Sequence, residues 1–127
     1  MMRCSRLIEA FGHAFSGLFF ALRTQRNMPI HLVIAAGVIG LGVWLGLSTT
    51  QWAVLALTIG SVLAAELLNS SLEVVVDMVS PDYHPLAKRA KDVAAGAVLL
   101  AAMVSVLVGL LILGPPLWAQ LMRLFGG

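Results

Sequence analysis

The sequence predicts an all-α integral membrane protein: a single domain over residues 1–127 with one amphipathic surface helix and three transmembrane helices. Composition is the first reason, because 60% of the residues are hydrophobic and 11% are charged, whereas a soluble domain has roughly 25% charged residues. Charge placement is the second. No Asp, Glu, Lys or Arg occurs between positions 27 and 65 or between 93 and 122, and about 20 apolar helical residues suffice to cross a bilayer core.

The first expected helix covers about residues 5–26 and has one apolar side. Its apolar side chains recur with the helical period and cluster on the wheel: Leu7, Ile8, Phe11, Phe15, Leu18, Phe19 and Leu22. Most polar side chains lie opposite, which is typical of a helix lying in the membrane interface. A helix packed only on the protein's own spans is the alternative.

Three apolar segments are expected to span the membrane, at about residues 28–47, 52–79 and 86–113. Trp44 and Trp52 flank the polar turn between the first two spans, as interfacial anchors do. The segment 80–85 contains two prolines and should separate the second span from the third. The third span is expected to end at Gly114, where two prolines follow.

The basic residues predict the orientation. Seven of the eight precede the first span or lie between the second and third: Arg3, Arg6, Arg23, Arg26, Lys88, Arg89 and Lys91. By the positive-inside rule, these segments and the N-terminus face the cytoplasm. The net charge of only +2 gives no sign of nucleic-acid binding.

The second predicted span carries a polar stripe formed by Glu66, Asn69, Glu73 and Asp77. At about 100° per residue these positions fall within roughly 80° of one another on a helix. Carboxylates at membrane depth are costly, so this stripe indicates a bound cation or a reaction. The stripe also fits the lining of an ion- or proton-conducting assembly, which is an alternative of another class.

The start of the third span supplies Lys91 and Asp92, which are placed to complete a cluster with the stripe. A simpler interpretation is that Glu73 and Asp77 only pair with Arg89 and Lys91 where the helices leave the bilayer. Glu66 and Asn69 lie about two turns deeper than Glu73 and Asp77. Glu66 is therefore the candidate general base.

Two longer segments, AELLNSSLEVVVD (65–77) and YHPLAKRAKDVAAGAVLLAA (83–102), resemble the signature of the prokaryotic diacylglycerol kinase family. The similarity extends upstream through Gly12, Gly17 and RNMPIHL (26–32), so that it covers about residues 6–113. The segments RNMPIHL and DVAAGAVL are similar in sequence to the undecaprenol kinase branch of this family.

The resemblance implies a homotrimer in the bacterial cytoplasmic membrane, with active sites shared between neighbouring chains. ATP, with Mg²⁺ as cofactor, would phosphorylate a lipid alcohol at the cytoplasmic interface. The expected alcohol is undecaprenol, and diacylglycerol is the alternative. Phosphoryl transfer asks a protein mainly for positioning and charge neutralisation, which carboxylates, one lysine and one base can provide.

The resemblance also implies residue roles. Glu66 matches the catalytic base, Asn69 lies beside it, and both contribute with Arg6 to the substrate site. Glu73 matches a metal-binding glutamate. The positions that match the nucleotide site are Gly12, Glu73, Asp77, Tyr83, His84, Lys91 and Asp92.

One position departs from the family pattern. Where the family usually has a second metal-binding glutamate just before RN, this chain has Gln25. Glutamine keeps one acceptor oxygen but loses the negative charge, so we expect weaker Mg²⁺ binding and slower turnover unless another carboxylate substitutes. A non-catalytic lipid-binding protein is therefore a further alternative.

Overall fold

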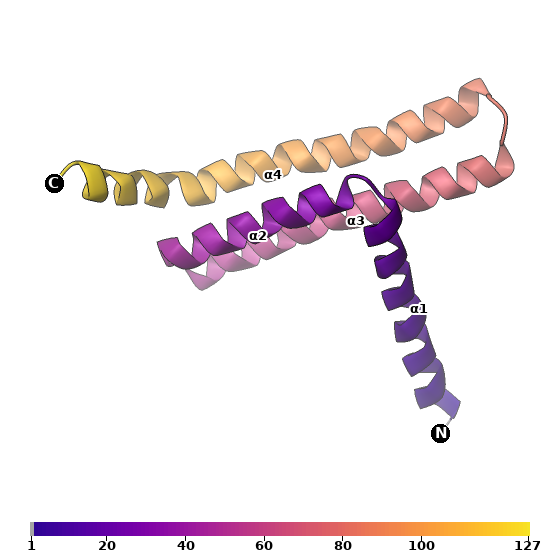
Figure 1. Cartoon of the computed structure of the whole chain (residues 1–127), viewed down its shortest axis with the longest axis horizontal. Coiled ribbons are helices and arrows are strands. Elements are labelled where there is room, and N and C mark those ends of the chain that lie inside the picture. Colours follow the sequence, from indigo (N-terminus) through magenta and orange to yellow (C-terminus); the bar gives the residue numbers. More distant parts are fainter. Residues whose placement is uncertain (1) are drawn as a thin grey trace.

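The computed structural model describes residues 2–127 as four helices. These are α1 (Met2–Thr24), α2 (Met28–Leu45), α3 (Thr49–Val79) and α4 (Pro85–Phe125). Helices α2, α3 and α4 lie side by side, and α1 leaves them at a steep angle (Figure 1). The last three are long and apolar enough to cross a membrane. The predicted all-α fold with three candidate spans is confirmed.

Helices α2 and α3 form a hairpin with a very short turn. Gly46 adopts the left-handed conformation with φ +67°, which glycine reaches without steric cost, and its N–H donates to the Gly42 carbonyl at 3.1 Å. Ser48 and Gln51 then form a capping box. The Gln51 N–H donates to Ser48 Oγ at 3.2 Å, and the Ser48 N–H donates to Gln51 Oε1 at 2.9 Å. These bonds satisfy backbone donors at the start of α3.

Helices α3 and α4 make the most extensive contact of any helix pair in the described chain. The segment between Val79 and Pro85 is non-helical, as its prolines predict. His84 caps α4, because its Nδ1 accepts the Leu86 N–H at 3.1 Å. Pro85 occupies the first turn, where a missing N–H costs no helical hydrogen bond.

Helix α4 does not end at Gly114, where the third span is expected to end, but continues through Pro115 and Pro116 to Phe125. Two prolines remove two helical hydrogen bonds. The sequence that follows, LWAQLMRLF, consists mostly of good helix formers, which explains why helix resumes at once. With 41 residues, α4 is about 60 Å long, twice the thickness of a bilayer core of about 30 Å.

Few side chains of the described chain are buried. The buried apolar residues are Ala21, Met28, Ala35, Leu55, Val62 and Leu113. Most large hydrophobic residues of all four helices are exposed, including the apolar side of α1. Such continuous apolar surface marks contact with lipid or with other chains. The interfacial position of α1 and the membrane limits at 28–47, 52–79 and 86–113 stay predictions.

The closest packing of the hairpin occurs at Gly42, which is buried. A Cβ atom at this position would lie 2.8 Å from Trp52 Cη2 and 3.0 Å from Leu47 Cδ1. Gly42 therefore allows the two helices to pack closely, and Gly46 allows the turn between them.

We expect Gly42→Ala to lower the apparent melting temperature in detergent micelles, measured by circular dichroism, because overpacking costs about 1–3 kcal/mol. Gly40→Ala is the matched control, since a Cβ at Gly40 meets nothing within 4 Å. Alanine in a helix is more favourable than glycine by about 1 kcal/mol, so this control should be neutral or stabilising. Equal shifts for both variants would contradict the packing argument.

Candidate functional site

Burial is graded along the polar stripe of α3. Glu66 is 2% exposed, Asn69 and Glu73 are half-buried, and Asp77 is exposed. The stripe therefore runs from the interior of the three-helix bundle to the end of α3 that leads into the 80–84 loop. This order agrees with the prediction that Glu66 lies deepest.

The Glu66 carboxylate faces His31 of α2. His31 Nε2 lies 3.7 Å from Glu66 Oε2, and the two side chains are 19% and 3% exposed. Within residues 2–127, Glu66 Oε2 has no hydrogen-bond partner, although it is fully buried. Buried polar atoms are almost always bonded, so an unbonded carboxylate oxygen marks a place where a ligand can donate a hydrogen bond.

His31 was missed as a site residue by the reasoning from sequence. A signal was present, because His31 is the one ionisable side chain between positions 27 and 65. It lies about as far before the α2–α3 turn as Glu66 lies after it. In an antiparallel hairpin, two such positions lie at the same level along the helix pair. The pairing of His31 with Glu66 therefore follows once α2 and α3 are known to form a hairpin.

Asn69 and Glu73 form the middle of the stripe. Asn69 Nδ2 donates to Glu73 Oε1 at 3.5 Å, at the long limit of a hydrogen bond. Asn69 Oδ1 is buried and has no hydrogen-bond partner in the part of the chain that the structure describes. An amide oxygen and a carboxylate are thus available beside each other, about one and two turns from Glu66.

Two ion pairs occupy the exposed end of the stripe. Lys91 Nζ lies 2.5 Å from Asp77 Oδ1 and joins α4 to α3, and Lys88 Nζ lies 2.6 Å from Asp92 Oδ2 within α4. Each pair is largely exposed, so neither adds much stability. Asp77 pairs with Lys91, as the simpler interpretation expected, and its role at the nucleotide site stays a prediction. Glu73 accepts a hydrogen bond from Asn69.

The loop after α3 places Tyr83 and His84 close in sequence to these ion pairs. Tyr83 is 79% exposed, and the His84 ring caps the start of α4. The residues expected to bind nucleotide on α3, α4 and this loop thus lie at one end of the α3–α4 pair. A polar, open surface of this kind is suited to a charged, water-soluble ligand.

The residues expected on α1 lie apart from this cluster. Arg6 and Gly12 are exposed on a helix that points away from the bundle (Figure 1), and a Cβ at Gly12 would meet no atom within 4 Å. Gln25 lies at the α1–α2 junction and is half-buried; Ala21 before it and Met28 after it in the sequence are buried. A single chain therefore leaves Arg6 and Gly12 remote from Glu66.

The donor set fits a magnesium ion held mainly by a nucleotide. Among the described residues, no three His, Cys, Asp or Glu side chains are close enough to hold a metal ion. Glu73 supplies a carboxylate, and Asn69 supplies a buried amide oxygen without a partner. Mg²⁺ prefers oxygen ligands and commonly uses one or two carboxylates together with phosphates and water.

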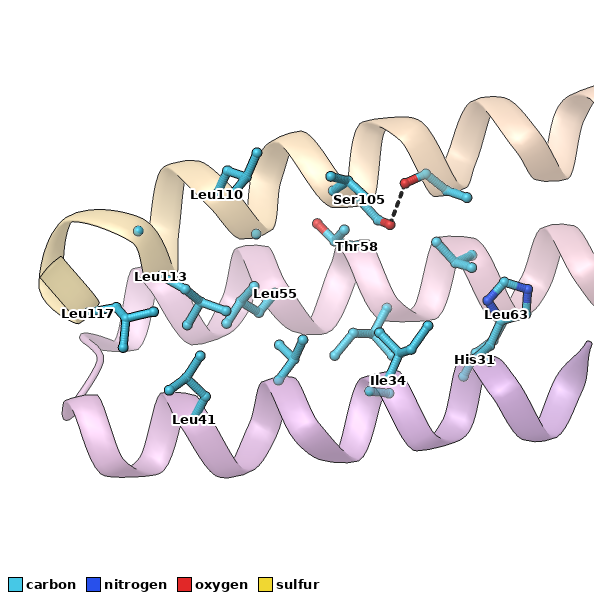
Figure 2. A pocket seen from close by; sticks show the side chains of 18 residues that line it. His31, Ile34, Leu41, Leu55, Thr58, Leu63, Ser105, Leu110, Leu113 and Leu117 are labelled. Carbon is cyan, nitrogen blue, oxygen red and sulfur yellow. Dashed lines mark hydrogen bonds between the residues drawn. The ribbon is translucent and has the colours of Figure 1, made fainter. Parts of the chain in front are cut away.

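An elongated cavity of about 440 Å³ lies between α2, α3 and α4. It extends from His31 at one end to Leu117 at the other (Figure 2). Its hydroxyl groups are bonded within their own helices, since Thr58 donates to the Val54 carbonyl and Ser105 to that of Ala102. The remaining lining is apolar apart from His31, so the cavity fits a hydrocarbon chain.

Comparison with known proteins places this arrangement in a family. The prokaryotic diacylglycerol kinase profile matches residues 12–113. The undecaprenol kinase of Bacillus subtilis is 42% identical over 113 residues, which cover 89% of this chain and 92% of that protein. The diacylglycerol kinase of Synechocystis sp. is 50% identical over 112 residues, covering 87% of this chain and 64% of that protein. The diacylglycerol kinase of Escherichia coli is 32% identical over 103 residues, covering 81% and 84%. This chain therefore belongs to the prokaryotic diacylglycerol kinase family.

Proposed function

We propose that this lipid kinase transfers the γ-phosphate of ATP to the hydroxyl group of undecaprenol. One observation carries the proposal: the buried carboxylate of Glu66 has an unbonded oxygen and faces His31, which lines the end of an apolar cavity. A lipid alcohol lying in this cavity would bring its hydroxyl group to Glu66 and leave its hydrocarbon chain between the helices.

The chemistry assigned to Glu66 is general-base catalysis. Glu66 accepts the proton of the lipid hydroxyl, whose oxygen attacks the γ-phosphorus. The bond from that phosphorus to the β–γ bridging oxygen breaks, and ADP leaves. Such transfer depends mainly on positioning and charge neutralisation, and a water-poor site favours attack by the lipid hydroxyl over attack by water.

The polar end of the stripe is assigned to the nucleotide. Lys91 neutralises phosphate charge, and Asp77 holds its ammonium group in place. Tyr83, His84 and Asp92 contribute to the same open surface. Glu73, with Gln25 and the amide oxygen of Asn69, would hold Mg²⁺, which when bound offsets the charge of the phosphates.

Shared sites explain why Arg6 and Gly12 lie far from Glu66 in one chain. We assign them to the site of a neighbouring chain in a homotrimer, where the exposed apolar faces of the spans pack together. By the positive-inside rule, the basic residues favour a cytoplasmic N-terminus and nucleotide surface. We assign the protein to the bacterial inner membrane.

Undecaprenol is preferred over diacylglycerol for a geometric reason. The cavity is one continuous apolar slot from His31 to Leu117, which suits the single chain of a polyprenol better than two acyl chains. Diacylglycerol is the second candidate, because relatives that are 50% and 32% identical bear the name diacylglycerol kinase.

The substrate assignment predicts that kcat/KM for undecaprenol exceeds that for diacylglycerol by about tenfold, which corresponds to roughly 1.4 kcal/mol of preferential binding in the transition state. The measurement is transfer of labelled γ-phosphate in mixed micelles at equal lipid mole fraction. A higher value for diacylglycerol would reverse the assignment, and no product from either lipid would refute kinase activity for this chain.

The role of Gln25 predicts that Gln25→Glu lowers the Mg²⁺ concentration needed for half-maximal activity, because a second carboxylate strengthens Mg²⁺ binding. Gln51→Glu is the matched control. It adds the same charge at the capping box of α3, where glutamate also serves, and should leave the Mg²⁺ dependence unchanged. Equal responses to both substitutions would show a general charge effect instead.

Shared sites predict complementation between inactive chains. Arg6→Ala and Glu66→Gln should each abolish most activity alone. Trimers reassembled from an equal mixture should recover roughly a quarter of the wild-type rate, because random assembly pairs two intact halves in that share of the sites. The measurement is the same phosphate transfer after co-refolding, with each variant refolded alone as the control. An absence of recovery would place each site within one chain.

A further inference from the structure

We propose that His31 is a positioning residue for Glu66: its ring N–H donates to the buried carboxylate oxygen and holds the base at the end of the lipid cavity. This inference rests on the proposed function, in which Glu66 takes the proton of the lipid hydroxyl. It adds a residue on α2 to a site otherwise composed of α3, α4, the loop between them and segments near the N-terminus.

Burial gives the first argument. The Glu66 side chain is 3% exposed, and its Oε2 atom lacks a hydrogen-bond partner among residues 2–127. Three cations are engaged away from Glu66, since Lys91 pairs with Asp77, Lys88 pairs with Asp92 and Arg23 lies over the ring of Phe19. His31 is the side chain that contacts the carboxylate of Glu66.

The distance gives the second argument. The 3.7 Å between His31 Nε2 and Glu66 Oε2 is longer than the roughly 2.7–3.2 Å of a hydrogen bond. Hydrogen bonds between catalytic groups are often long before substrate binds and shorten in the complex. The two atoms need to approach by only about 0.5–1 Å to form the bond.

The position of His31 gives the third argument. Its ring belongs both to the pair with Glu66 and to the lining of the apolar cavity (Figure 2). The rest of the lining extends along the bundle as far as Leu117. Removing the imidazole therefore disturbs the base and leaves most of the surface for the lipid chain intact, so turnover should suffer more than lipid binding.

The test compares His31→Phe and His31→Gln in the wild-type and Glu66→Gln backgrounds. We expect His31→Phe to lower kcat for undecaprenol about 10- to 100-fold, as a misplaced catalytic group does, with KM changed less than about twofold. His31→Gln keeps an N–H donor and should restore most of the loss. In the Glu66→Gln background, where the base is absent, His31→Phe should cause no further loss.

Ser61→Ala is the control, because Ser61 lies on α3 outside the cavity lining and bonds only the Leu57 carbonyl of its own helix. Size-exclusion elution and helical circular dichroism verify that each variant folds. Equal fractional losses in both backgrounds, a loss confined to KM, or unchanged turnover of His31→Phe in an active enzyme would overturn the positioning role. A wild-type chain that phosphorylates no lipid would instead refute the proposed function, and this inference with it.

Discussion

A carboxylate held inside an apolar helical bundle is the constraint on which the site depends. Hydrocarbon offers no hydrogen-bond partners, so backbone groups at that depth are satisfied within helices and polar side chains there are rare. Glu66 is the costly exception. The α2–α3 hairpin brings His31 beside it, and the tight turn at Gly46 with the close contact at Gly42 fixes the hairpin. Packing at the turn of the hairpin thus helps to position Glu66 and His31 at the other end of the hairpin.

Most of the fold follows from sequence, because long apolar runs specify membrane helices and glycine, serine and proline mark the turns between them. The polar stripe also follows, since the helical repeat alone decides which side chains share a face. The continuation of α4 past Pro115 does not follow from sequence. Proline disfavours a helix, but the leucine-rich segment after it favours one, and the sequence alone does not decide between them. His31 and the cavity required the pairing of separate helices. Spacing along one helix carries no information on which partner lies across from it.

The exposed apolar surface needs a cover of lipid or of other chains, and the proposed homotrimer would provide part of that cover. A lone protomer buries few residues, and α1 projects from the bundle with its aromatic face uncovered (Figure 1). A thin bundle of three spans also has too little volume to surround a nucleotide and a lipid together. Placing Arg6 and Gly12 in a neighbour's site resolves both features at once, because the same contacts that cover apolar surface would complete the site.

The graded stripe of α3 gives a physical reason for the order of ligands that the proposed function assigns to it. Asp77 and Lys91 stand in the open, where a highly charged nucleotide keeps much of its hydration. Glu66 lies eleven residues earlier, about 16 Å along the helix, in surroundings that a triphosphate cannot enter without a large desolvation cost. Asn69 and Glu73 occupy the intermediate turns, so the γ-phosphate need reach only to their level. The lipid hydroxyl approaches from the apolar side. On the proposed function, the two substrates thus meet where burial changes, so that a water-soluble donor reaches a membrane-bound acceptor.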